Sequence, residues 1–170
     1  MTDMITAPSE LTATHDGDAD YQATVLFDAP PEAVFDALTA TAGLAGWWAP
    51  VSGSGADGGD LRFVFNDPLL IHVDQAQRLS SVRWTVVECS FLPDWVGTTL
   101  RFDLRPRESG GCEVRFRHQG LTPRLECFSL CRAGWDHQLA SLHDYVASGQ
   151  GQPFGSEGHR RARAGAANQR

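Results

Sequence analysis

Three glycines in the segment GSGADGG, Gly53, Gly55 and Gly58, have the GxGxxG spacing that opens dinucleotide-binding domains. In such domains the glycines follow a strand and precede a helix, so that the phosphates lie against the helix N-terminus. Here the order is reversed. A short helical stretch and the sequence WWAP precede the glycines, and the alternating segment 61–65 follows them. We therefore expect a loop that leads into a strand, with no bound nucleotide.

The basic residues exclude two further kinds of chemistry. The chain has a net charge of -7, and all its basic residues are arginine. Without lysine it can form no Schiff base and cannot supply the phosphate-binding lysine of a P-loop. The arginines are scattered, apart from a basic cluster at 159–163 that is typical of a solvated tail. We therefore expect no nucleic-acid partner.

The cysteines and histidines lack the spacing of a metal or nucleophile site. The four cysteines follow no CxxC pattern, and we expect reduced thiols that pack as small apolar groups. Cys127 and Cys131 are one helical turn apart, but no second ligand pair stands near them. The chain also contains neither HExxH nor a GxSxG elbow. We expect no metal, no cofactor and no set of catalytic residues.

His118 is the polar residue whose role is most open. It follows Val114 and Phe116 at alternate positions, so it shares their covered face. A structural histidine, bonded within the protein, is the favoured interpretation. A ligand-orienting group is the second, and a general acid or base, assisted by Asp136 or Arg62, is the third.

The elements that must position these residues follow from periodicity. Segments with a period of two predict strands, and spacings of three and four predict helices. The strands are expected at 21–27, 60–66, 69–75, 81–90, 97–105 and 112–119, with short helices near 31–38 and 41–47 and a long helix at 125–148. The resulting fold class is α+β, a curved antiparallel sheet wrapped around the last helix.

The two flanks differ in composition from this domain, which covers residues 20–148. Residues 1–19 are acidic and without period, and residues 149–170 are rich in Gly, Gln and Arg. We expect both flanks to be disordered. No apolar run approaches the roughly 20 residues of a membrane span, and the first residues do not resemble a signal peptide. We therefore expect a cytoplasmic protein with no membrane partner.

Several motifs in this order resemble the helix-grip superfamily, also called START or SRPBCC, which includes birch pollen allergen-like proteins and polyketide cyclases. The nearest resemblance is to the branch of activators of the heat shock protein 90 ATPase. The motifs are FDAPPEAVFDALT, GWWAP, GGDLRFVF, Arg78-Leu79 before Trp84, the glycine turn before CEVRFRHQGL, and Gly134-Trp135 followed by Leu139 and Leu142. They cover about residues 20–147. Gln77 stands where these proteins commonly have proline.

The resemblance implies an apolar pocket between the sheet and the C-terminal helix. The implied pocket positions are Trp47, Trp48, Phe63, Phe65, Trp84, Phe102, Phe116, His118, Trp135 and Leu139. The expected function is non-catalytic binding of a small hydrophobic or aromatic ligand. Two alternatives stay open: a polyketide cyclase or dehydratase that uses the same cavity, and a co-chaperone-like stimulator of a heat shock protein ATPase. A homodimer is also left open.

Overall fold

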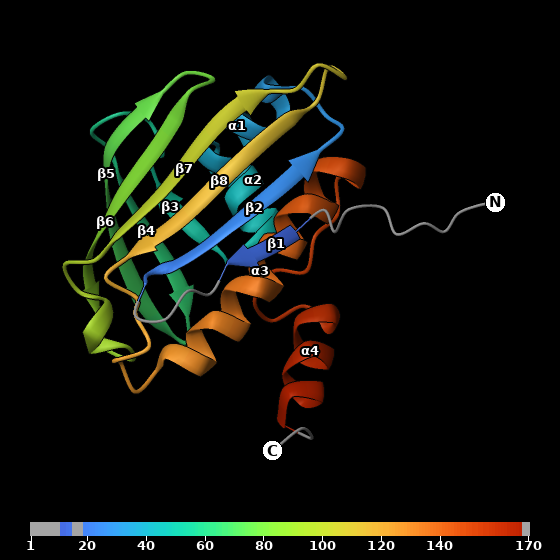
Figure 1. Ribbon diagram of the computed structural model, residues 1–170. Helices are drawn as coiled ribbons and strands as arrows, with labels where there is room; N and C mark the ends of the chain where they lie inside the picture. Colours follow the sequence, from blue (N-terminus) through green and yellow to red (C-terminus); the bar gives the residue numbers. More distant parts are fainter. Residues whose placement is uncertain (1–10, 15–18, 168–170) are drawn as a thin grey trace.

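The computed structural model describes residues 11–14 and 19–167. One open, curved antiparallel sheet of eight strands forms its main layer, in the order β1-β2-β8-β7-β6-β5-β4-β3 (Figure 1). The strands are β1 (Leu11–Thr14), β2 (Tyr21–Phe27), β3 (Val51–Gly53), β4 (Asp60–Phe65), β5 (Asp67–Gln77), β6 (Ser81–Cys89), β7 (Thr99–Pro106) and β8 (Cys112–Gln119).

The helices are α1 (Pro31–Thr39), α2 (Thr41–Trp47), the one-turn 3-10 helix η1 (Pro93–Trp95), the long α3 (Phe128–Ser148) and α4 (Glu157–Ala167). Three of them, α1, α2 and α3, lie against the concave side of this sheet, and α4 projects beyond them (Figure 1). Pro31 occupies the first position of α1, where its missing N–H costs nothing. Gly149 ends α3 in the left-handed conformation, with φ of 83°. Figure 1 shows α3 running across the concave side of the sheet, with α1 and α2 beside it.

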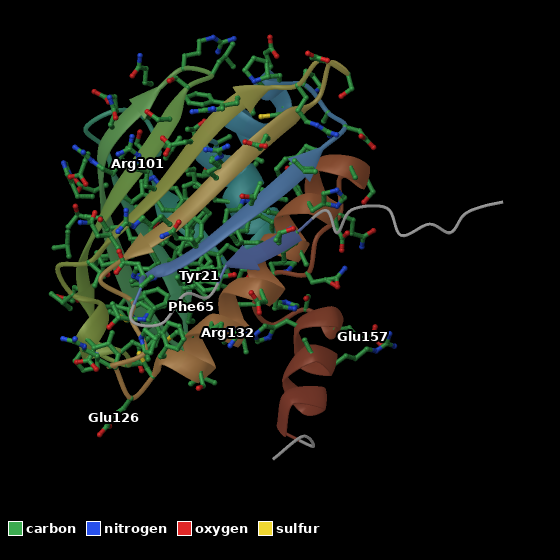
Figure 2. All side chains as sticks on the ribbon, viewed as in Figure 1. Tyr21, Phe65, Arg101, Glu126, Arg132 and Glu157 are labelled. Carbon is green, nitrogen blue, oxygen red and sulfur yellow. The ribbon has the colours of Figure 1, made fainter. Side chains whose placement is uncertain are left out.

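Successive side chains along each strand point to opposite faces of the sheet, and this alternation decides which of them form the core. In β2 every second residue, from Tyr21 to Phe27, is buried. The same pattern holds in β7 and β8, whose inward residues include Phe102 and Phe116. The outward residues at 99–105 in β7 and in β8 are polar, and Figure 2 shows Arg101 on this outer face. The arrangement is the helix-grip fold, as the sequence predicted.

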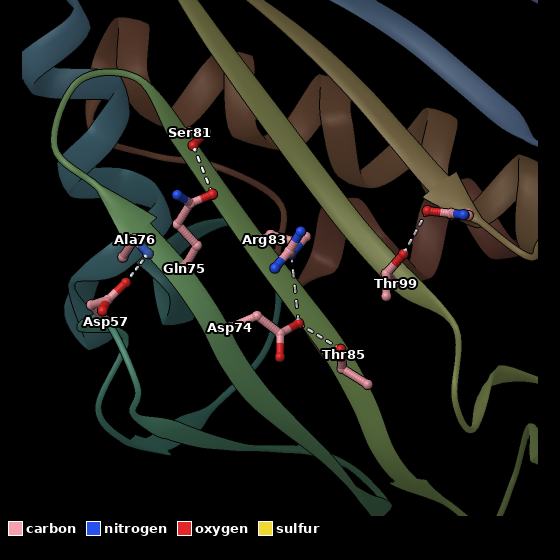
Figure 3. Close-up of polar contacts among 9 residues, drawn as sticks. Asp57, Asp74, Gln75, Ala76, Ser81, Arg83, Thr85 and Thr99 are labelled. Atoms are coloured by element: carbon pink, nitrogen blue, oxygen red, sulfur yellow. Dashed lines mark hydrogen bonds and ion pairs between the residues drawn. The ribbon is translucent and has the colours of Figure 1, made fainter.

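The glycine segment is a loop that joins β3 to β4 and lies against β5. The Asp57 carboxylate accepts a hydrogen bond of 2.8 Å from the backbone N–H of Ala76 (Figure 3). Gly58 and Gly59 exchange backbone hydrogen bonds with Val73. A side chain at Gly55 would collide with the carbonyl group of Thr39. Gly55 and Gly59 therefore serve close backbone packing, Gly58 has a left-handed φ of 78°, and a strand, not a helix, follows the segment.

The outer face of the sheet is held by short polar contacts between neighbouring strands. The Asp74 carboxylate accepts a 2.5 Å hydrogen bond from Thr85 and lies 4.0 Å from the Arg83 guanidinium (Figure 3). Arg101 pairs with Asp103 on the same face. Because each of these arginines has an acidic neighbour, the face carries mixed charge and not a basic stripe.

The structure differs from the sequence expectation at both flanks. Residues 11–14, expected to be disordered, pair with β2 as β1, and the expected disordered tail contains α4. The strand β3 was not expected either. β1 and β3 are short edge strands, too brief for a period to be read from them. In α4 an ion pair joins Glu157 and Arg161, one turn apart.

Within the residues that the structure describes, no helix has both the length and the apolar character needed to cross a membrane.

Candidate ligand-binding pocket

A pocket of about 400 Å³ lies at one end of the sheet. Five parts of the chain surround it: the end of α2, the first half of α3, the connection from β6 through η1, the turn from β4 to β5, and α4 with the segment that leads into it. In Figure 1 the turn from β4 to β5 and the beginning of α3 lie at the lower end of the molecule. Six aromatic side chains line it: Trp48, Phe65, Phe91, Trp95, Trp135 and Phe154.

These rings contact one another and form a continuous wall. Trp135 lies 5.3 Å from Trp48 and 5.9 Å from Trp95 between ring centroids, and its ring is nearly parallel to that of Trp95. Phe65 lies 5.3 Å from Phe154 and 5.8 Å from Phe91. Figure 2 shows Phe65 at this end of the sheet, close to the beginning of α3. Such edge-to-face and parallel ring pairs attract one another beyond the apolar area that they bury.

Three of the residues expected to bind ligand line this pocket, namely Trp48, Phe65 and Trp135. The other seven do not line it and are buried in the core: Trp47, Phe63, Trp84, Phe102, Phe116, His118 and Leu139. Two of these buried residues, Trp47 and Trp84, differ in whether the indole N–H has a hydrogen-bond acceptor. The N–H of Trp47 donates to the carbonyl oxygen of Ala37, whereas that of Trp84 has no partner among the described residues.

Other lining residues were missed by the sequence analysis. Phe91 and Trp95 lie on the connection between β6 and β7, between the expected strands 81–90 and 97–105. The sequence did contain a signal for these two residues, because two aromatic side chains within five residues are unusual for a short loop. Phe154 lies in the expected disordered tail. On α3, Gly134 and Gln138 lie one turn apart beside Trp135, and both line the pocket.

His118 is completely buried, and protein groups occupy both of its ring nitrogens. The indole N–H of Trp135 donates to Nδ1 over 3.0 Å. Because Nδ1 must accept, the proton of the neutral imidazole lies on Nε2, which donates to Thr98 Oγ1 over 2.8 Å. The Thr98 hydroxyl in turn donates to the carbonyl oxygen of Trp95. Burial lowers the pKa of His118 to about 3.

This network connects the core to the pocket wall. Trp135 and Trp95 line the pocket, while His118 lies behind them and meets the ring of Trp95 edge to face, with centroids 4.7 Å apart. His118 thus fixes the orientation of both tryptophans without lining the pocket itself.

The groups considered for a cyclase do not meet in the pocket. Asp136 accepts a 2.6 Å hydrogen bond from the Tyr21 hydroxyl, Arg62 is exposed on β4, and neither lines the pocket. Burial raises the pKa of the Cys131 thiol, which lines the pocket, so this thiol is protonated and a poor nucleophile. In the described part of the chain no group of three or more His, Cys, Asp or Glu residues could hold a metal ion.

Gln138 is a pocket residue that is both polar and deeply buried. The residue is only 8% exposed, and its Oε1 has no hydrogen-bond partner among the described residues. The neighbouring His137 is paired, since its Nε2 lies 3.1 Å from the carbonyl oxygen of Gln152. The pocket therefore combines a large aromatic wall with a few polar residues, among them Asp67, His137, Gln138 and His159.

Comparison with known proteins places the chain in a family. Residues 28–147 match the family model described as "Activator of Hsp90 ATPase homolog 1-like protein". A search of curated proteins found no match. The solution structure of the Aha1 dimer from Colwellia psychrerythraea is 29% identical, with a TM-score of 0.68, and the match covers 76% of this chain and 97% of that one.

Two further solved structures share the fold at lower identity. The protein SSP2350 from Staphylococcus saprophyticus is 18% identical over 79% of this chain and 97% of its own, with a TM-score of 0.65. The solution structure of CalU16 from Micromonospora echinospora is 14% identical, with a TM-score of 0.66, and the match covers 95% of this chain and 97% of that one. That match extends beyond the residues of the family model.

Proposed function

The chain belongs to the family of Activator of Hsp90 ATPase homolog 1-like proteins, and on this premise we propose that it binds a small hydrophobic or aromatic molecule without transforming it. The site is the pocket between the first half of α3, η1, the β4–β5 turn and the segment before α4. The observation that carries the proposal is the aromatic lining of a pocket of about 400 Å³. Sites for small molecules typically have volumes of about 300–1,000 Å³ and mostly apolar walls.

The polar groups near the pocket support binding over catalysis. A general acid or base must reach the reacting atoms and must exchange a proton at working pH. His118 lies behind the wall with both nitrogens engaged, and its pKa of about 3 keeps it neutral. Asp136 is engaged with Tyr21. The proposed role needs only shape and apolar surface.

Intrinsic fluorescence tests the proposal, because Trp48, Trp95 and Trp135 line the pocket. We expect naphthalene and flavone to change the tryptophan emission in a saturable way. Replacement of Gly134 by leucine should weaken this binding by about tenfold or more, because the new side chain fills space in the pocket. Nothing lies within 4 Å of a Cβ added at Gly134, so the first carbon of the new side chain meets no neighbour.

The matched control is Ala140→Leu, which places the same side chain on an exposed part of the same helix. It should leave the titration unchanged. Both variants should fold, and Gly134→Leu should be more stable by about 0.5–1 kcal/mol, since glycine in a helix interior is unfavourable. The absence of saturable binding in the wild type, or equal binding in Gly134→Leu, contradicts the proposal.

We also propose a homodimer as the assembly, on the ground that the Colwellia psychrerythraea relative was solved as a dimer. Size-exclusion chromatography with light scattering distinguishes a dimer from a monomer of 18.5 kDa.

A further inference from the structure

We propose that the pocket selects organic cations, and that it holds the ammonium group of an aromatic amine between three phenylalanine rings and the carboxylate of Asp67. The three phenylalanines are Phe65, Phe91 and Phe154. This inference rests on the proposed function, since it concerns the same pocket. It adds a preference for one charge and the residues that produce it.

The three phenylalanines form an open aromatic cluster where the pocket meets solvent. Phe91 is 39% exposed, and Phe65 and Phe154 are partly exposed, whereas the three tryptophans of the wall are buried. The ring centroid of Phe65 lies 5.8 Å from that of Phe91 and 5.3 Å from that of Phe154. The face of an aromatic ring attracts a cation that lies within about 6 Å of its centroid. Three rings this close together can therefore surround one ammonium group.

Asp67 adds a carboxylate beside this cluster. Phe65, Asn66 and Asp67 all line the pocket, although successive residues of a strand face opposite sides. The turn between β4 and β5 makes this possible, with a positive φ of 90° at Asn66. Asp67 is exposed, and no arginine or histidine of the described residues forms an ion pair with it. Its charge is therefore available to a ligand.

The two histidines that line the pocket, His137 and His159, are bonded to the backbone of the segment before α4. His159 Nδ1 accepts from the N–H of Gly155 over 3.3 Å. Because this nitrogen accepts, it carries no proton, and the ring of His159 is neutral. His137 donates from Nε2 to the carbonyl oxygen of Gln152 over 3.1 Å. Neither contact gives the pocket a positive charge.

The arginines leave the pocket without a counter-ion for an anion. Among the described residues no arginine lines it, although the chain has fourteen. Arg160 and Arg161 are exposed on α4 and do not line it, and Arg161 is paired with Glu157. With neutral histidines, Asp67 is the one charged residue of the lining, so the pocket attracts cations and repels anions. An ammonium group next to Asp67 also stays near solvent, which limits the loss of its hydration.

Isothermal titration calorimetry at pH 8 with three related probes tests the inference, because histidine side chains are ordinarily uncharged at that pH. The probes are 2-naphthylmethylammonium, a cation, 2-naphthalenemethanol, which is neutral, and 2-naphthoate, an anion. In the wild type we expect the ammonium to bind about tenfold more tightly than the alcohol, from ring contacts and one exposed ion pair together. The carboxylate should bind most weakly of the three.

Two variants separate the two parts of the site. Asp67→Asn keeps the shape of the side chain and removes its charge, so the preference for the ammonium over the alcohol should fall about threefold and 2-naphthoate should bind more tightly. Phe91→Leu keeps an apolar side chain and removes the aromatic face, so the same preference should fall about threefold. Both positions are exposed, so both variants should fold. Each preference is a ratio of affinities within one variant, so a change in overall stability cancels.

The matched control is Glu108→Gln, which changes the net charge by the same amount as Asp67→Asn. Glu108 is an exposed acid between β7 and β8 that does not line the pocket. This variant should retain the full preference. Added sodium chloride should reduce the preference in the wild type more than in Asp67→Asn, because salt screens an exposed ion pair.

The outcomes separate the two proposals. Equal binding of the ammonium and the alcohol to the wild type overturns the charge preference but leaves the binding function standing. A preference that persists unchanged in Asp67→Asn and Phe91→Leu, or that falls equally in Glu108→Gln, also overturns this site for the ammonium. Failure of the wild type to bind any of the three probes overturns both proposals together.

Discussion

At the scale of single residues, His118 shows how a titratable group can be given a purely structural task. Its neutral ring accepts from Trp135 and donates to Thr98, and it is fully buried. The pKa of His118 is about 3 in the folded protein, because burial disfavours the charged ring, and about 6.5 in the unfolded chain. Between these two values the unfolded state binds more protons. The free energy of unfolding therefore falls as the pH falls from about 6.5 toward 3.

Replacement of His118 by phenylalanine tests this account. At pH 7 the variant should lose about 1–3 kcal/mol of stability, because the buried indole N–H of Trp135 loses its acceptor. On acidification it should lose less stability than the wild type, by about 1.4 kcal/mol per pH unit below 6.5. Urea unfolding at pH 7, 6 and 5 measures both effects.

The control for this prediction is His72, whose pKa is shifted in the opposite direction to that of His118. A hydrogen bond to Asp60 raises the pKa of His72 in the folded state. Its contribution to stability is therefore present below the unfolded pKa and is lost as the pH rises through the folded one. The variants His72→Gln and His118→Phe should therefore change the pH dependence of the free energy of unfolding in opposite directions. Parallel stability curves for the wild type and His118→Phe contradict the account.

At the scale of elements, the segment before α4 completes the pocket because it is tied to two other helices. The backbone N–H of Phe154 donates to the carbonyl oxygen of Trp48 over 2.7 Å. Ser141 on α3 accepts from the N–H of Gln152 over 2.6 Å and donates to the carbonyl oxygen of Trp47. These bonds place the Phe154 ring against Phe65, where it forms part of the aromatic wall.

Truncation of this ring should weaken ligand binding. Phe154→Ala removes apolar surface worth about 1–1.5 kcal/mol of ligand contact, so 2-naphthol should bind roughly tenfold more weakly. The backbone hydrogen bond to Trp48 remains, and the fold should persist. Val87→Ala, at an exposed apolar residue outside the pocket, serves as the control. Unchanged affinity in Phe154→Ala shows that this segment takes no part in the site.

At the scale of the whole molecule, ligand binding must appear as increased stability. A ligand that binds only the folded state, at a free concentration of 100 times its dissociation constant, adds about 2.7 kcal/mol to the free energy of unfolding. For a chain of 170 residues this corresponds to a rise of roughly 5–10 °C in the melting temperature. Differential scanning calorimetry with 2-naphthol measures it. Gly134→Leu should show a much smaller rise at the same probe concentration, and an equal rise would place binding outside the pocket.

The sequence by itself determined the fold. The period of two in 21–27 and 112–119, and the spacings of three and four after Phe128, specify which faces are apolar, and an antiparallel sheet wrapped on one helix is the arrangement that buries them all. It also determined that the glycine segment leads into a strand. Local patterns are sufficient for these features because each depends on neighbouring residues along the chain.

Only the tertiary structure decided where the pocket lies. The sequence identifies Phe102 and Phe116 as inward-facing, but cannot tell whether an inward ring meets another side chain or open space. In the centre of the sheet these rings pack against each other and fill the interior. At the end of the sheet the pocket is lined by Phe91, Trp95 and Phe154, which belong to a loop and a tail without periodic patterns. Their contacts join residues far apart in the sequence, so packing in three dimensions, not local pattern, creates the site.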